Sequence, residues 1–439
     1  MASRLAAFGL GGELGRYVDG LGSPERIPIP LLMALARQCS LVGDQGRALR
    51  LLDEVHRADP EFPPGLLARA QVLMYMGRLR DAVHDVDRCL QRAPEIAHAH
   101  WLRSRLGAVG LEPDYPERLQ QRLARADHSA QDQAFLGFAL HTLLDARGDH
   151  AGAWAALEQG CRAKRGLLEH DLDQVRQLVD GLVAMPVALR AAPATGNAKV
   201  PIFIVGMHRS GTTLLETLLD AYPQVRGVGE CYDFTAAMRL ATDHACRGVI
   251  DATIVARAPD LDFGEVGSAY LDSMSWRLGG EPFFVDKLPS NFLNVGFICA
   301  ALPQARILHM VRDPMETCFS NLRELFSDAN PHSYDQEELA EYFLLYRRLM
   351  THWHAAFPGR ILDVSYASLA MDPEKEMRRV ADFCGIDYIQ AMSDPRRNRG
   401  RAVATASAVQ VRERVALPEV PKWVPYRPWL QPLAATLEA

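Results

Sequence analysis

A short apolar segment that leads directly into a glycine-bounded turn constrains the fold most strongly. Residues 202–205 read Ile-Phe-Ile-Val, which is typical of a strand buried in a parallel sheet. The turn Gly206-Met-His-Arg-Ser-Gly-Thr-Thr213 follows, and the apolar spacing of Leu214 to Ala221 predicts a helix. In this layout the backbone N–H groups and the positive end of the helix dipole face an anion. We therefore expect an α/β domain with a phosphate-binding loop, although any α/β domain contains strand–turn–helix units.

The turn lacks the lysine of nucleoside-triphosphatase loops. Gly211 is followed by Thr212, where the Walker pattern requires Gly-Lys-Ser/Thr. The cation sits earlier, at Arg209, so the sequence implies no magnesium-dependent triphosphate site. A smaller phosphosulfate head group suits this loop better, held by Arg209, Ser210, the threonine hydroxyls and the backbone N–H groups.

A second segment also carries groups that bind anions. Residues 307–311 read as a strand, Arg312-Asp-Pro follows at its carboxyl end, and Ser320 lies on the helix after it. An arginine that leaves a strand and a serine on the following helix can converge on one anion. We therefore expect two separate phosphate sites.

With both motifs in place, residues 199–435 resemble the sulfotransferases that use 3′-phosphoadenosine-5′-phosphosulfate (PAPS). The turn around Gly211 looks like that family's 5′-phosphosulfate motif, and Arg312 with Ser320 looks like its 3′-phosphate motif. The resemblance is strongest to the protein-tyrosine sulfotransferase branch and its bacterial relatives fused to tetratricopeptide (TPR) repeats. It implies PAPS as donor, adenosine 3′,5′-bisphosphate as product, no metal, and an acceptor hydroxyl such as a protein or peptide tyrosine. A carbohydrate or a phenolic molecule remains an alternative acceptor.

The resemblance also implies roles for individual residues. Glu230 would be the general base, Lys287 and Ser407 would stabilise the bridging oxygen, and Arg209 would bind the sulfate and 5′-phosphate. The expected donor-binding residues are Arg209, Ser210, Gly211, Thr212, Thr213, Leu214, Arg312, Ser320, Tyr366 and Gln410. Small-molecule sulfotransferases carry a histidine base in a Lys-Thr-His-Leu-Pro segment, and the matching stretch Val285-Asp-Lys-Leu-Pro289 has none, which favours Glu230. Alternatively, Glu230 is a helix cap or surface charge, Lys287 a surface ion pair, and Tyr366 a packing residue.

The N-terminal half repeats itself at a fixed distance. Gly43 and Gly77 are 34 residues apart, and so are Ala36 and Ala70, Ala48 and Ala82, and Pro60 and Pro94. A weaker unit begins at Gly148. This period resembles that of TPR repeats, in which paired helices stack into a concave surface that docks peptides. The alternative is a helical bundle with chance periodicity.

Length and composition indicate the number of domains, the kinds of partner and the location of the chain. A chain of 439 residues is too long for one ordinary core, and its net charge of −6 argues against nucleic acid as a partner. Eight cysteines without a C-x-x-C pair favour reduced thiols and no zinc site. The first fifteen residues lack the apolar run of a signal peptide, and no run is long enough for a membrane span, which favours the cytoplasm.

We therefore expect a multidomain α + α/β chain. A TPR-like helical repeat domain occupies residues 1–190, a linker residues 191–198, and a P-loop-type α/β sulfotransferase domain with a central parallel sheet residues 199–439. Two other functions stay open: a P-loop nucleotide kinase, disfavoured by the missing lysine, and a non-catalytic TPR scaffold with a decayed catalytic domain.

Overall fold

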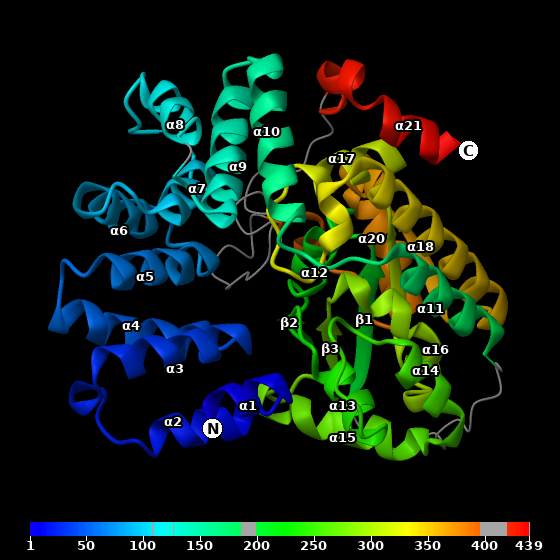
Figure 1. Cartoon of the computed structure of the whole chain (residues 1–439). Coiled ribbons are helices and arrows are strands. Elements are labelled where there is room, and N and C mark those ends of the chain that lie inside the picture. Colours follow the sequence, from blue (N-terminus) through cyan, green and yellow to red (C-terminus); the bar gives the residue numbers. More distant parts are fainter. Residues whose placement is uncertain (108, 126, 186–198, 396–418, 439) are drawn as a thin grey trace.

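The computed structural model describes residues 1–107, 109–125, 127–185, 199–395 and 419–438. The described part of the N-terminal half is helical, and the C-terminal half is built on a parallel sheet (Figure 1). Both were expected from the sequence.

Antiparallel helix pairs make up much of the N-terminal half. Three pairs follow the predicted glycine positions: α3 (Ile29–Leu41) with α4 (Gln45–Ala58), α5 (Pro63–Tyr75) with α6 (Leu79–Arg92), and α9 (Ala130–Ala146) with α10 (His150–Arg165). Gly43, Gly77 and Gly148 turn the chain between the helices, each with a positive φ. The other helices here are α1 (Ala2–Ala7), α2 (Gly11–Asp19), α7 (Ala97–Arg105), α8 (Tyr115–Leu123) and α11 (Leu172–Ala184). Helix pairing agrees with the repeat, while membership of the TPR family stays a prediction.

The helical half contributes to two different cores. One core joins buried side chains from Leu14 to Leu102, including Leu52 and Leu73. Among the described residues of the other half, the partly buried Trp276 packs against it. Helices α9 to α11 instead share a core with the α/β half, through side chains such as Leu136 and Leu182. The predicted linker 191–198 lies outside the described residues.

Five parallel strands form the sheet, in the order β2-β3-β1-β4-β5. The strands are β1 (Val200–Gly206), β2 (Val225–Gly229), β3 (Phe283–Asp286), β4 (Arg306–Val311) and β5 (Ile361–Ser365). Because side chains alternate along a strand, Ile202 and Ile204 enter one core while Phe203 and Val205 enter the other. The sheet is therefore buried on both faces. Because all five strands are parallel, their carboxyl ends lie at the same edge of the sheet.

Helices cover both faces of this sheet. Helices α12 (Thr212–Leu219) and α20 (Pro373–Cys384) pack on the face of Ile202 and Ile204. The remaining helices of the α/β half are α13 (Asp233–Ala241), α14 (Ala252–Arg257), α15 (Phe263–Met274), α16 (Val295–Ala301), α17 (Pro314–Leu322), α18 (Gln336–Ala356), α19 (Tyr366–Met371) and α21 (Gln431–Glu438). Among the described helices, none combines the length and apolar character needed to cross a bilayer.

The C-terminal tail ties the two halves together. The Tyr426 hydroxyl donates to Asp145 at the end of α9 over 2.6 Å, and the Tyr426 side chain is fully buried. The Trp429 ring stacks on Trp154 of α10, with centroids 6.0 Å apart. The tail thus clamps α9 and α10 against the α/β half.

Candidate active site

Each of the five strands ends just before a residue predicted for the site. The turn with Arg209 follows β1, Glu230 follows β2, Lys287 follows β3, Arg312 follows β4 and Tyr366 begins the helix after β5. Because parallel strands end at the same edge, residues from separate parts of the sequence meet there.

The turn between β1 and α12 is compact and held from within. The Ser210 hydroxyl donates to the Met207 carbonyl over 2.8 Å, and Ser210, Thr212, Thr213 and Leu214 are all buried. Arg209 has a φ of 67°, which is unusual for a residue with a side chain. The helix α12 begins directly after this turn, so its N-terminal N–H groups lie at the strand edge.

Gly211 is required by close packing as well as by its backbone. Its φ is +109°, a conformation that side chains rarely adopt. A Cβ at this position would lie 2.6 Å from the Tyr366 ring and 3.2 Å from the Met310 side chain. Tyr366 therefore packs directly against the turn, on the side of β4 and β5.

The two predicted anion motifs are joined by hydrogen bonds. Arg209 Nε donates to the Ser320 hydroxyl over 3.2 Å, and an Arg312 nitrogen donates to the Arg209 carbonyl over 3.1 Å. The Arg312 guanidinium also lies 4.4 Å from the centre of the Tyr366 ring. The structure thus brings Arg209, Ser320, Arg312 and Tyr366 together.

Glu230 and Lys287 form a direct ion pair. Lys287 Nζ lies 2.6 Å from Glu230 Oε1 and 4.0 Å from Glu216 Oε2. The Lys287 side chain is fully buried, whereas 30% of the Glu230 side chain is exposed. Lys287 is therefore not the solvent-exposed ion pair that the sequence left open.

A buried carboxyl group lies next to this pair in sequence. Asp286 accepts a hydrogen bond from the Tyr270 hydroxyl over 2.9 Å, and Asp286 is fully buried. Burial, together with the charge of Asp233, raises the pKa of Asp286 to about 7, although the bond from Tyr270 opposes this. Asp286 therefore keeps its proton in mildly acidic solution.

His208 lies in the turn but remains neutral. Its ring packs edge-on against Phe326, with centroids 5.5 Å apart. Burial lowers the pKa of His208 to about 4, and the nearby charges of Lys287 and Arg209 act in the same direction. An uncharged imidazole at pH 7 cannot supply the positive charge of an anion site.

Several residues around the site were not predicted. Glu316 accepts a hydrogen bond from Arg312 Nε over 3.0 Å and forms an ion pair with another Arg312 nitrogen at 2.9 Å. Glu324 lies 3.7 Å from Arg209. Glu216 accepts the Gly229 N–H over 2.7 Å. Glu316 follows Arg312 by four residues, so helical spacing could have indicated that contact. Nothing local in the sequence indicates the other two.

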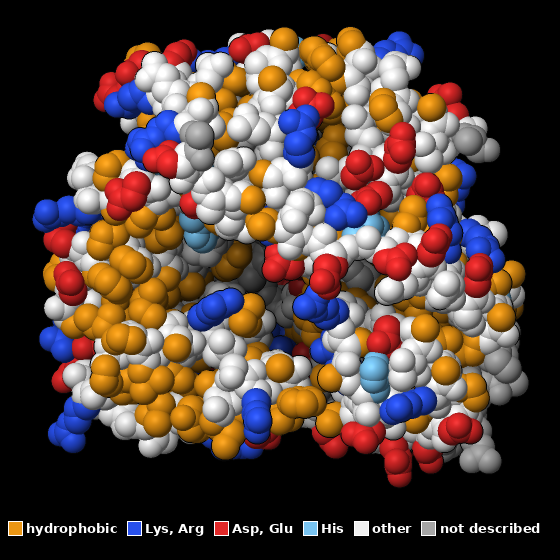
Figure 2. Space-filling view, in the orientation of Figure 1, with side chains coloured by type: hydrophobic (Ala, Val, Ile, Leu, Met, Phe, Trp, Pro, Cys, Tyr) orange, Lys and Arg blue, Asp and Glu red, His pale blue; other side chains and the backbone are white. Residues whose placement is uncertain are grey.

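The helical half reaches the site as well. Arg105 at the end of α7 donates to Glu324, so Glu324 lies between Arg105 and Arg209. Tyr75 of α5 is half-buried. Desolvation raises the pKa of its hydroxyl, which the charge of Arg105 opposes and the charge of Glu230 reinforces. Figure 2 shows a hollow near the middle of this face, between the N-terminal helices on the left and the α/β half on the right.

Two predicted residues cannot be placed. Ser407 and Gln410 lie outside the described residues. The residues that are placed offer two neighbouring groups of anion-binding side chains and, beyond them, a carboxylate paired with a buried lysine. Such a site can hold a ligand with two anionic ends and move a proton beside one of them.

Comparison with known proteins covers both halves of the chain. The model of the sulfotransferase family matches residues 201–390. An uncharacterized protein of Aquifex aeolicus is 26% identical over 425 residues, which are 90% of this chain and 53% of that protein. A putative protein-tyrosine sulfotransferase of Caenorhabditis briggsae is 26% identical over 198 residues, 45% of this chain and 69% of that protein.

A third relative carries a different acceptor in its name. Heparan sulfate glucosamine 3-O-sulfotransferase 3A1 of Mus musculus is 26% identical over 225 residues, 47% of this chain and 51% of that protein. The chain thus spans about half the length of this protein and of the Aquifex protein.

Proposed function

We propose, from the premise that this chain belongs through residues 201–390 to the sulfotransferase family, that it transfers the sulfuryl group of PAPS to an acceptor hydroxyl. One observation carries the proposal: the two anion motifs are hydrogen-bonded to each other, through Arg209 to Ser320 and through Arg312 to the Arg209 carbonyl. A donor with one phosphate at its 3′ position and a phosphosulfate at its 5′ position needs two adjacent anion sites. A nucleoside triphosphate needs one extended anion site for a single chain of phosphates.

In this proposal the donor spans the strand edge. The turn 206–213 and the start of α12 hold the 5′-phosphosulfate through N–H groups and Arg209. Arg312 and Ser320 hold the 3′-phosphate. Glu316 orients the Arg312 guanidinium through its two contacts, and Tyr366 supplies an aromatic face beside it.

Glu230 and Lys287 would carry the proton and the charge. Glu230 takes the proton of the acceptor hydroxyl as the acceptor oxygen forms its bond to sulfur. The bond from sulfur to the bridging oxygen breaks, and negative charge grows on that oxygen. Once Glu230 is protonated, it holds the Lys287 ammonium less strongly, and Lys287 can then stabilise the leaving oxygen. Ser407 would assist at the same oxygen.

The acceptor would enter from the hollow beside the helical half. A protein or peptide tyrosine is favoured because one relative carries that name and because a helical repeat offers a surface on which a chain can dock. Tyr75 and Arg105 would form the wall of this entrance that belongs to the helical half. A carbohydrate hydroxyl is the alternative.

Labelled donor tests the proposal directly. The full chain is incubated with PAPS labelled in the sulfuryl group and with three sets of acceptors: tyrosine peptides, heparan-type oligosaccharides and small phenols. We expect label in the tyrosine peptides and release of adenosine 3′,5′-bisphosphate. If only the oligosaccharides or only the phenols are labelled, that class is the acceptor instead of tyrosine. If no acceptor is labelled and the chain does not bind PAPS, the enzymatic proposal is overturned.

A further inference from the structure

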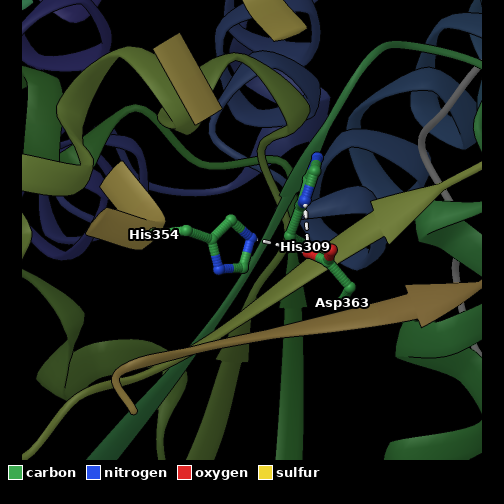
Figure 3. A group of neighbouring side chains, drawn as sticks. All are labelled: His309, His354 and Asp363. Atoms are coloured by element: carbon green, nitrogen blue, oxygen red, sulfur yellow. Dashed lines mark hydrogen bonds and ion pairs between the residues drawn. The ribbon is translucent and has the colours of Figure 1, made fainter. Parts of the chain in front are cut away.

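A second cluster of polar side chains lies on the sheet apart from the strand edge. His309 is in the middle of β4 and Asp363 is its direct neighbour on β5 in the strand register. His354 approaches from the last turn of α18. Figure 3 shows the two imidazole rings and the Asp363 carboxylate gathered at one place.

The three side chains are close enough to share one ion. His309 Nδ1 and His354 Nε2 each lie 2.7 Å from the same oxygen, Asp363 Oδ1. One potential ligand atom from each residue lies within 4.8 Å of the other two. Among the described residues, no other group of three such side chains is this close.

Two imidazoles and one carboxylate are a donor set that suits Zn²⁺ and similar transition metals. The surroundings also suit an ion. The other nitrogen of His309 is hydrogen-bonded to the Tyr346 hydroxyl, which fixes the ring as partners of ligating histidines commonly do. When Nδ1 binds the ion, Nε2 carries the ring proton and donates it to the phenol oxygen.

Access and adjustment are both possible at this position. The Asp363 and His354 side chains are 57% and 36% exposed, whereas His309 is 8% exposed. Ligands at about 2.0–2.1 Å in a tetrahedral site lie about 3.3 Å from one another, so the present contacts must open by roughly half an ångström. The two exposed side chains can make that movement, and water can fill the remaining coordination positions.

We propose that His309, His354 and Asp363 form a binding site for a divalent transition-metal ion such as Zn²⁺. The ion would join the end of α18 to β4 and to the edge strand β5. This site does not depend on the proposed function and takes no part in the transfer.

Metal titration of the full chain tests the proposal. Protein treated with chelator is titrated with Zn²⁺ by calorimetry, and with Co²⁺ by visible absorption, which reports the ligand geometry. We expect one ion per chain, and a higher midpoint of thermal unfolding when Zn²⁺ is present. His354→Ala or Asp363→Asn should each weaken binding by at least about 100-fold, because even partners of ligands cost 10–100-fold.

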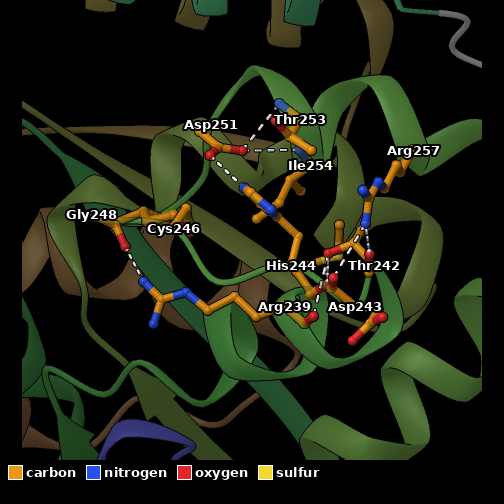
Figure 4. Close-up of polar contacts among 12 residues, drawn as sticks. Arg239, Thr242, Asp243, His244, Cys246, Gly248, Asp251, Thr253, Ile254 and Arg257 are labelled. Atoms are coloured by element: carbon orange, nitrogen blue, oxygen red, sulfur yellow. Dashed lines mark hydrogen bonds and ion pairs between the residues drawn. The ribbon is translucent and has the colours of Figure 1, made fainter.

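A matched control uses another histidine–aspartate pair. His244 Nε2 lies 2.7 Å from Asp251 Oδ2 (Figure 4). No third potential ligand from the described part of the chain forms a comparable group with these two residues. His244→Ala should leave Zn²⁺ binding unchanged. The proposal is overturned if no saturable binding of Zn²⁺ occurs. It is also overturned if each of the variants His354→Ala and Asp363→Asn binds Zn²⁺ as tightly as the wild type, because the ion would then be held by others of the fourteen histidines in the chain.

Discussion

At the scale of single residues, the candidate site depends on charges that are buried in pairs. Lys287 is fully buried between Glu230 and Glu216, and Glu324 lies between Arg209 and Arg105. A buried charge without its partner is costly, so each partner constrains where the other can lie. Substitutions at these positions that remove the charge should therefore change the properties of the site even when they conserve the shape of the side chain.

Replacing the proposed base is the first test at this scale. Glu230→Gln keeps the shape of the side chain but cannot accept a proton from the acceptor. We expect kcat to fall by about 10²-fold or more, while the affinity for adenosine 3′,5′-bisphosphate stays within about twofold. Glu265→Gln, at an exposed position of α15, is the control and should change neither quantity. An unchanged kcat in Glu230→Gln would remove Glu230 from the mechanism.

The pKa of Asp286 predicts how stability depends on pH. In the folded chain the pKa of Asp286 is about 7, above the ordinary value of 3.8. Between these two pH values the folded chain holds a proton on Asp286 that the unfolded chain has lost, and this proton stabilises the fold. This contribution is complete below pH 4 and is lost as pH rises towards 7. Between pH 5 and 7 the wild type should lose roughly 2 kcal/mol of unfolding free energy at this group.

Asp286→Asn cannot titrate and should show a flatter dependence. Urea unfolding of both chains at pH 5, 6 and 7 gives the comparison. Equal slopes for the two chains would mean that Asp286 ionises normally in the folded state.

At the scale of elements, the sequence predicted strands better than contacts. The apolar run 202–205 and the segment 307–311 both lie in strands, since a fully buried parallel strand leaves a continuous apolar signal. The helix pairs also followed from Gly43 and Gly77. The cluster of His309, His354 and Asp363 was not predictable, because the three residues come from separate elements and share no spacing.

The same limit applies to the candidate site. Arg209, Arg312 and Ser320 were found because each belongs to a local motif. Glu324, which lies beside Arg209, was not, since its contact with Arg105 depends on how α7 packs against the segment that follows α17.

Two glycines with positive φ allow a matched test of the turn. Gly211→Ala meets both an unfavourable φ and the Tyr366 ring, whereas a Cβ at Gly43 would meet nothing within 4 Å. We expect Gly43→Ala to cost about 1 kcal/mol of stability and to leave donor binding unchanged. Gly211→Ala should cost more and weaken the binding of adenosine 3′,5′-bisphosphate by at least about tenfold, measured by calorimetry. Equal effects of the two changes would contradict the close packing of the turn.

At the scale of the whole molecule, the helical half is coupled to the site. Helices α9 to α11 share a core with the α/β half, and Arg105 balances the buried Glu324 beside Arg209. Without Arg105, Glu324 would attract Arg209 more strongly, and Arg209 would be less available to a bound anion.

Arg105→Met tests this coupling. We expect the affinity for adenosine 3′,5′-bisphosphate to fall by about tenfold, within the range usual for coupled sites. Adding Glu324→Gln should restore most of it, because the unbalanced charge is then gone. Arg118→Met, at an exposed position of α8, is the control. A loss that Glu324→Gln does not restore would point to a packing defect instead.

The most direct measurement of the central claim compares two nucleotides by calorimetry. Adenosine 3′,5′-bisphosphate and adenosine 5′-monophosphate differ only in the 3′-phosphate, for which Arg312 and Ser320 form the proposed site. We predict that the wild type binds the bisphosphate at least about tenfold more tightly, and that Arg312→Ala removes most of this difference. Equal affinities for the two nucleotides in the wild type would contradict the account.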